Sequence, residues 1–164
     1  MLGSDLNEMK LVLEVLKQTF EGIAWHGPSF MYILKGVDKV QASERPIDSR
    51  HTIWEIVNHC SYWMEAVTEA LRGEKMPDIK STEDWPKMGK TDEDWIKAQD
   101  RLRKTYEELV ESIESLNETQ LTQKVHGSFR GRSYTTTFRK MLHGISDHNT
   151  YHAGQVAILK KRIV

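Results

Sequence analysis

Three of the seven histidines lie on or beside the apolar stripes of segments with helical spacing. His148 and His152 are four residues apart, so their imidazoles share one helix face, one turn apart, and can reach the same ion. His59, one turn before Trp63 in another such segment, could meet the pair across a helix interface. Three neutral imidazoles with an open fourth position are typical of a catalytic zinc site, and nickel or iron(II) is also compatible.

Each of these histidines could instead be a core residue whose ring is satisfied by a backbone carbonyl or a buried water. Glu55 shares a helix face with His51 and His59 and could orient His59, but it also fits a helix cap, and it cannot readily do both. Cys60, the one cysteine, lies about 100° around the helix from His59, so we expect a small core residue. Surface, capping or loop positions are predicted for His26, His51, His126 and His143.

The predicted site is compatible with two types of reaction, and the sequence identifies no catalytic residue. A divalent ion held by neutral imidazoles keeps its full charge, so it can lower the pKa of a water or thiol, or polarise a carbonyl. Hydrolysis and thiol transfer both follow, and the absence of an H-E-x-x-H motif favours thiol chemistry. A non-catalytic metal or small-ligand binding module is the alternative, and a fourth protein ligand would favour it.

Polar and aromatic residues around the histidines suggest further contacts. Gln155, one turn beyond His152, could hydrogen-bond a ligand on the metal or a neighbouring helix. Tyr151 and Trp63 could line the mouth of a pocket. The sequence has one locally basic cluster, which comprises Arg130, Arg132, Arg139 and Lys140. We expect it to form a solvated surface, and the alternative is a clamp for the carboxylates of an anionic cosubstrate.

Length and composition exclude several classes of protein. The 164 residues can bury one sizeable core but not two, which predicts a single domain over 1–164. A formal net charge of -1 provides no positive field for general nucleic-acid binding. The N-terminal residues alternate apolar with charged side chains, unlike a signal peptide, and the longest apolar run, Phe30 to Leu34, is far shorter than the roughly 20 residues of a membrane span. With its single cysteine, the chain is expected to be cytoplasmic.

The elements that must position the histidines are predicted to be helices, because apolar residues recur at steps of three and four. Thr52 and Glu55 fit a capping box, and Thr91 followed by three acidic residues fits another helix start. Long helices are predicted over about 6–23, 53–71, 92–116 and 136–163, with a short extra helix over 30–37.

The connections follow from glycines and prolines. Residues 74–90 are predicted to form an ordered crossing loop, and 117–121 a short turn. The stretch 125–134 fits either a small hairpin or an ordered loop. The economical fold for these elements is all-α, an antiparallel four-helix bundle with apolar stripes facing one another.

Four stretches of the sequence resemble the DinB/YfiT-like superfamily of bacterial proteins. They are WHGPS at 25–29, HTIWEIVNHCSYW at 51–63, DWP at 84–86 and HGISDHNTYHAGQVAILKK at 143–161. The most specific piece is the H-x3-H-x-G-Q pattern that begins at His148. The similarity covers almost the whole chain.

This resemblance implies a four-helix bundle that holds one divalent metal through His59, His148 and His152, with zinc or nickel favoured and iron also suitable. It also implies a frequent homodimer and a small-molecule substrate. Members with known activities are bacillithiol S-transferases and a mycothiol-dependent maleylpyruvate isomerase, which use a small thiol, and many others are described as metal-dependent hydrolases. Asn149 stands where relatives often carry aspartate, which argues against a charged role there.

Overall fold

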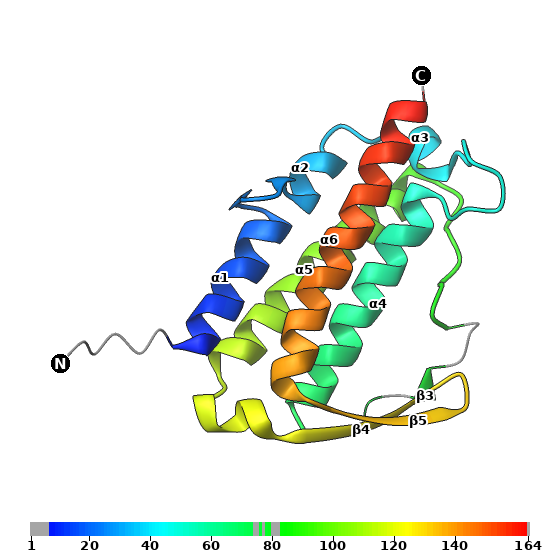
Figure 1. Ribbon diagram of the computed structural model, residues 1–164. Helices are drawn as coiled ribbons and strands as arrows, with labels where there is room; N and C mark the ends of the chain where they lie inside the picture. The colour runs from blue at the N-terminus through cyan, green and yellow to red at the C-terminus, as the bar shows by residue number, and fades with distance from the viewer. Residues whose placement is uncertain (1–6, 74–75, 77, 80–82, 164) are drawn as a thin grey trace.

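The computed structural model describes residues 7–73, 76, 78–79 and 83–163. Four long helices lie side by side, and shorter helices connect them (Figure 1). The long helices are α1 (Glu8–Phe20), α4 (Ile53–Leu71), α5 (Asp92–Glu114) and α6 (Phe138–Arg162). The short ones are α2 (Phe30–Leu34), α3 (Lys39–Ser43) and the 3₁₀ turn η1 (Glu118–Thr122). The predominantly helical fold predicted from the sequence is therefore confirmed.

The core lies between the four long helices, and α4 contributes the most buried side chains to it. α4 packs on both α5 and α6, while α1 packs on α6 and α5. Fully buried side chains such as Phe20, Trp54, Leu102 and Val156 come from all four helices. Because α4 is covered on most of its circumference, polar side chains on it, His59 included, are also buried.

The predicted helix starts are present at atomic detail. The Thr52 hydroxyl accepts a hydrogen bond from the Glu55 amide, and the Glu55 carboxylate accepts one from the Thr52 amide. Thr91 and Asp94 form the same reciprocal pair before α5. Each capping box satisfies two backbone amides that have no partner within the helix, which fixes where these helices begin.

Short strands correct the all-α prediction. The strands β4 (Lys124–Phe129) and β5 (Arg132–Thr137) form an antiparallel hairpin, so the open choice for 125–134 is resolved as a hairpin. Its two turn residues, Arg130 and Gly131, both have positive φ, as a tight turn between twisted strands requires. β3 (Asp78–Ile79) pairs in parallel with the end of β4. A second pair, β1 (Ile23–Ala24) and β2 (Gly27–Pro28), follows α1, which ends at Phe20 rather than at residue 23.

The crossing loop runs along α4 from Glu83 to Lys90, whereas residues 74–75, 77 and 80–82 of the predicted loop lie outside the described residues. The Asn58 side-chain amide donates to the carbonyl of Lys87 at 3.0 Å, and the Thr52 hydroxyl lies 3.1 Å from the Met88 sulfur. These contacts fasten the loop to α4 and place Asp84 and Trp85 beside His59.

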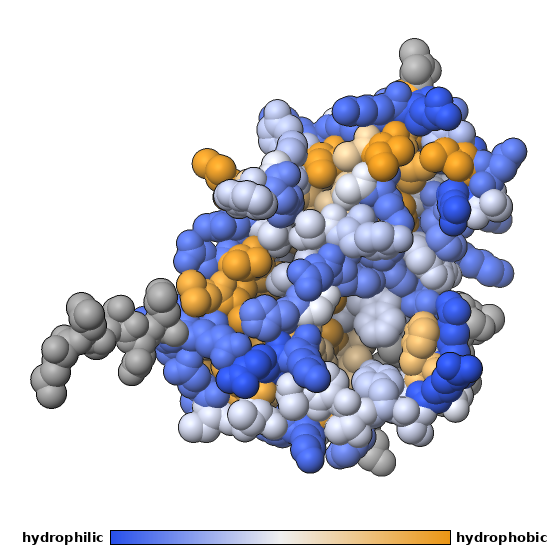
Figure 2. Space-filling view, in the orientation of Figure 1, coloured by the Kyte–Doolittle hydropathy of each residue, from blue (hydrophilic) through white to orange (hydrophobic). Residues whose placement is uncertain are grey.

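The surface is mostly hydrophilic (Figure 2). Apolar side chains gather over α1 and near the C-terminal end of α6. In the described part of the chain, no helix combines the length and the apolar character needed to cross a membrane.

Candidate metal centre

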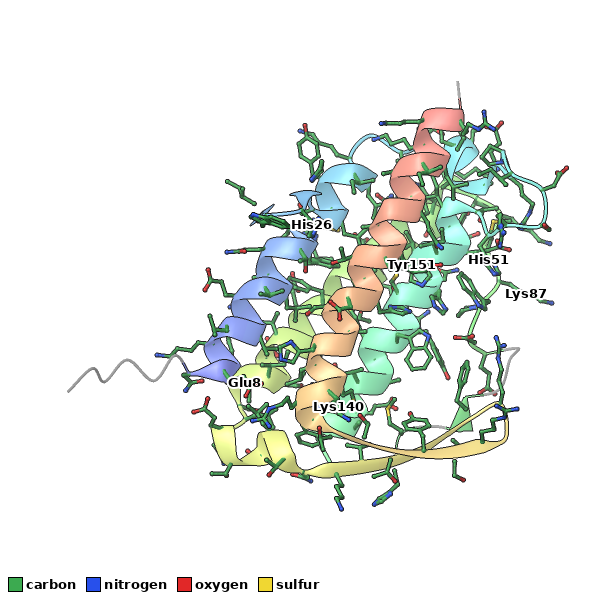
Figure 3. All side chains as sticks on the ribbon, in the orientation of Figure 1. Glu8, His26, His51, Lys87, Lys140 and Tyr151 are labelled. Carbon is green, nitrogen blue, oxygen red and sulfur yellow. The ribbon has the colours of Figure 1, made fainter. Side chains whose placement is uncertain are left out.

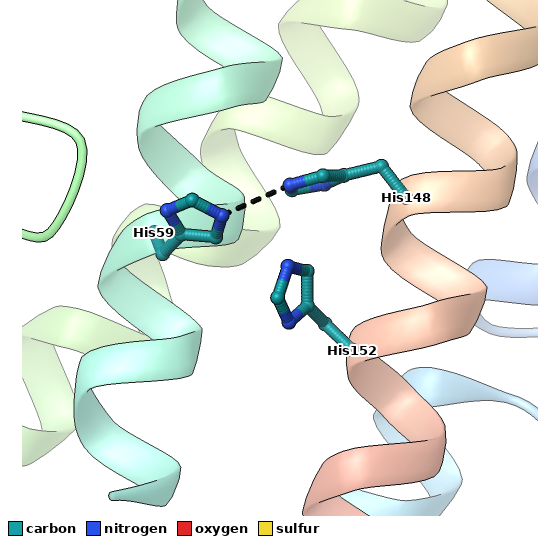
Figure 4. A group of neighbouring side chains, drawn as sticks. All are labelled: His59, His148 and His152. Atoms are coloured by element: carbon teal, nitrogen blue, oxygen red, sulfur yellow. Dashed lines mark hydrogen bonds between the residues drawn. The ribbon is translucent and has the colours of Figure 1, made fainter. Parts of the chain in front are cut away.

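The interface of α4 and α6 brings together the three histidines predicted from the sequence (Figure 4). The Nε2 atoms of His59 and His148 are 3.0 Å apart, and one nitrogen from each of the three rings lies within 4.8 Å of the others. His59 and His152 are each only 5% exposed, and His148 is half-buried. The four-residue spacing on α6 therefore places the rings of His148 and His152 on one helix face, as predicted, and His59 meets the pair from α4.

Each ring has an oxygen atom next to its Nδ1. The Nδ1 of His59 lies 2.5 Å from the backbone carbonyl oxygen of Asp84, and that of His152 lies 2.8 Å from Gln155 Oε1. The Nδ1 of His148 faces Asn149 Oδ1 at 3.4 Å. The Asp84 and Gln155 oxygens can only accept, so His59 and His152 donate from Nδ1 and, when neutral, carry a lone pair on Nε2.

This arrangement fits a bound cation. The Nε2 atoms of His59 and His148 lie at hydrogen-bond distance, 3.0 Å, so in the metal-free protein His148 can donate its one ring proton to His59, and a bound ion would take the place of that proton. Burial lowers the pKa of His148 to about 3 and that of His152 to about 4, and burial also lowers the pKa of His59, so the three rings are neutral at neutral pH, the state in which imidazole binds a metal ion. Tetrahedral zinc with nitrogen ligands at about 2.0–2.1 Å requires nitrogen atoms roughly 3.3 Å apart. The Nε2 atoms of His59 and His148, 3.0 Å apart, lie close to that separation.

The crossing loop holds His59 from two directions. The indole of Trp85 stacks on the His59 ring with centroids 3.8 Å apart, while the Asp84 carbonyl accepts the ring's Nδ1 proton. The buried Asp84 carboxylate accepts a hydrogen bond from Trp63 Nε1 at 2.9 Å and lies 3.4 Å from His59 Nδ1. Its other oxygen lies 3.6 Å from the Arg130 guanidinium. Asp84 and Trp85 therefore fix the orientation of His59.

Glu55 does not orient His59, so this sequence-based alternative is wrong. Its carboxylate accepts hydrogen bonds from the Thr52 amide at 2.8 Å and from Arg45 at 3.0 Å, and it lies 3.4 Å from His51 Nδ1. The capping role and Arg45 occupy it, and Asp84 takes the position beside His59 instead.

Other predicted residues have clear places. The Gln155 side-chain oxygen accepts a hydrogen bond from His152 on its own helix rather than from a neighbouring helix. Cys60 is fully buried in the core, and burial raises its thiol pKa, which confirms the packing role. The four remaining histidines lie outside the cluster, and Figure 3 shows His26 and His51 on well-separated parts of the molecule.

The basic residues before α6 do not form a common clamp. Arg139 pairs with Glu8 at the start of α1, near the beginning of α6 (Figure 3), with both Glu8 oxygens 2.9 Å from its Nε. Arg130 pairs with Asp84, while Arg132 and Lys140 are exposed. The surface interpretation of this cluster therefore holds for Arg132 and Lys140, and the two others have structural partners.

Two cavities flank the histidine cluster, one on the His152 side and one on the His148 side. The first, of about 490 Å³, is lined in part by His51, Trp85, Tyr151, His152 and Gln155. The second, of about 460 Å³, is lined in part by Trp63, Phe129, Tyr134, Met141 and His148. Both Tyr151 and Trp63 thus line cavities as predicted. Among the residues that the structure describes, neither lining includes an aspartate or glutamate, and no fourth histidine, cysteine or carboxylate joins the cluster.

Together, the fold and the cluster define a helical protein with a three-histidine candidate metal centre at a helix interface. Residues 24–156 match the DinB superfamily, and the chain belongs to this superfamily. The crystal structure of a conserved protein from Enterococcus faecalis is similar, with a TM-score of 0.66 and 15% identity over 94% of this chain and 96% of that chain. At this identity the likeness concerns the fold alone. A comparison with curated proteins found no match.

Proposed function

We propose that this chain is a metal-dependent enzyme acting on a small molecule, in which the four long helices form an antiparallel bundle around one divalent ion. His59, His148 and His152 are its ligands. The observation that carries the proposal is that three Nε2 atoms converge between two cavities, while no fourth ligand from the described residues closes the cluster. Catalytic sites keep such an open position for substrate, whereas structural sites have four protein ligands.

The residues around the cluster prepare it for this role. A bound divalent ion supplies a Lewis acid that lowers the pKa of a thiol or water, or polarises a carbonyl. Asp84 and Gln155 hold two of the rings with their Nε2 atoms unprotonated. His148 forms part of one cavity wall and His152 part of the other, so molecules in the two cavities approach the same point.

Thiol transfer is the reaction that the site favours. A thiol becomes nucleophilic when its sulfur loses a proton, and its ordinary pKa of about 8.5 is far below that of water at about 15.7. A thiol beside the ion therefore needs no further base. The described linings of both cavities contain no carboxylate that could act as such a base, which agrees with thiol transfer. In the proposed reaction a low-molecular-weight thiol loses its proton to solvent, and its sulfur forms a bond to an electrophilic carbon while the bond from that carbon to a leaving group breaks and the leaving group departs as an anion.

Hydrolysis is the second candidate, and His51 is the observation that favours it. His51 lines the same cavity as His152, and its ring is held by stacking on Trp85 at 3.4 Å. Its Nδ1 lies 3.4 Å from Glu55, which leaves Nε2 to accept a proton from water.

An activity panel separates the two reactions. The metal-loaded protein would be assayed with small thiols plus 1-chloro-2,4-dinitrobenzene, and separately with p-nitrophenyl esters. For thiol transfer we expect metal-dependent conjugation that His152→Leu abolishes and that His51→Gln and the control His126→Leu retain. Ester hydrolysis lost in His51→Gln would favour the second candidate instead. The enzymatic proposal would be contradicted if neither assay shows an activity that depends on both the metal and His152.

A further inference from the structure

The cavity on the His148 side has an apolar lining. It is visible in Figure 2 as a hollow between α6 and the β4–β5 hairpin, and its volume of about 460 Å³ falls in the range of small-molecule pockets. Aromatic and aliphatic side chains dominate its walls, and its described lining includes no lysine, arginine, aspartate or glutamate. A charged group would lose its hydration there without gaining a partner, whereas an apolar group would be stabilised.

The apolar wall is continuous with the histidine cluster. The ring of Trp63 lies 6.1 Å from that of Phe129 and 5.9 Å from that of His148, measured between centroids. His148 is therefore both a wall of this cavity and a member of the candidate metal centre. A molecule with its apolar part against Trp63 and Phe129 would have its other end beside the three Nε2 atoms.

Gly144 keeps this cavity open. It lies one turn before His148 inside α6, where glycine is less favourable than alanine. A Cβ added at Gly144 would meet no heavy atom within 4 Å, and its φ is not positive, so neither close packing nor backbone conformation requires glycine here. Gly144 is instead part of the cavity lining. A larger side chain at this position would project into the space that a ligand would use.

We propose that this cavity is a subsite for an uncharged apolar group of the substrate, such as an aromatic group, and that Gly144 limits the size of the group that it accepts. The chemistry at the other end of that substrate rests on the function proposed above. The apolar character of the subsite does not rest on that function, because it follows from the cavity lining alone.

The first test uses metal-free protein. The neutral fluorescent probe N-phenyl-1-naphthylamine should bind the wild type and lose about tenfold or more in affinity in Gly144→Leu and Gly144→Phe, with a smaller loss in Gly144→Ala. Gly154→Leu is the matched control: it replaces a glycine of the same helix that also has no heavy atom within 4 Å of an added Cβ but lines neither flanking cavity. Gly144 variants should melt at the wild-type temperature or above, because they remove a helix-interior glycine. Equal probe affinity in wild type and Gly144→Phe would overturn the proposal.

The second test links the subsite to the metal centre. On zinc-loaded protein, calorimetry should show benzohydroxamate binding about tenfold or more tightly than acetohydroxamate, because only the former has a ring to bury. In Gly144→Phe this preference should vanish while acetohydroxamate affinity and zinc content stay unchanged. Equal affinities in the wild type would refute the subsite. Failure to bind zinc or either hydroxamate would refute the proposed function instead, and the metal-free probe would still decide the subsite.

Discussion

Replacing Asp84 with asparagine should weaken metal binding without unfolding the protein. The Asp84 side chain is 5% exposed and its Oδ1 lies 3.4 Å from the Nδ1 of His59, so its negative charge stabilises a positively charged imidazole–metal unit in a partly desolvated place. Residues that support a metal ligand in this way typically contribute 10- to 100-fold in affinity. We therefore expect Asp84→Asn to raise the dissociation constant for zinc by about that factor, or about 1.4–2.7 kcal/mol.

The fold should tolerate this change. Asparagine keeps an oxygen that can accept the Trp63 indole proton, and the lost ion pair with Arg130 is long and more than half exposed on the arginine side. Such pairs contribute about 1 kcal/mol at most. Asp84→Ala, by contrast, leaves the Trp63 donor without its partner and should cost about 1–3 kcal/mol of stability in addition.

Competition with a chromophoric zinc chelator measures the affinity, and thermal unfolding of the metal-free proteins measures the stability. Asp147→Asn is the matched control, because it removes the same charge from an exposed residue next to His148. Zinc binding by Asp84→Asn within twofold of the wild type, or an equal loss of affinity in Asp147→Asn, would refute a supporting role for the Asp84 charge.

Three further predictions concern pH, Gln155 and assembly. Because burial holds the pKa values of His148 and His152 at about 3 and about 4, below the ordinary 6.5, zinc affinity should persist below pH 6.5, lower than the sequence alone suggested. The unfolded chain binds more protons in that window, so thermal stability of the metal-free protein should be greatest above pH 6.5 and fall as pH drops toward 4; a flat profile would contradict this. Gln155→Leu should lower zinc affinity about tenfold by removing the Nδ1 acceptor of His152, and Gln155→Glu should retain it, as chelator competition would show. We also propose a homodimer, which would cover exposed apolar side chains such as Val15 and Trp25; a monomeric mass at all concentrations in light scattering would exclude it.

Local signals account for what could be predicted from the sequence. The helices α4 and α5 begin at capping boxes whose residues are three positions apart, and the pair His148 and His152 depends only on the pitch of one helix. His59 could be proposed because its helix has a continuous apolar stripe. These features need no knowledge of tertiary structure.

Contacts between distant segments account for what could not. Asp84 meets His59 across 25 residues of chain, and no periodicity signals that meeting. The sequence does not distinguish the β4–β5 hairpin from a loop, because the hairpin is short and few of its side chains are buried. The sequence predicts a ligand or a neighbouring helix as the partner of Gln155, and its bond to His152 could not be predicted because that bond depends on side-chain rotamers rather than on spacing.

The central claim is tested most directly by the metal content of protein purified without a histidine tag and loaded with zinc, nickel or iron(II) at neutral pH. We predict about one divalent ion per chain in the wild type and in the control variants His26→Leu and His126→Leu. His59→Leu, His148→Leu and His152→Leu should each lose most of the metal while keeping a cooperative thermal unfolding transition, because the apolar stripes still hold the helices together. Full metal retention in any of these three variants would remove that residue from the site, and a wild type that binds none of the three metals would contradict the account.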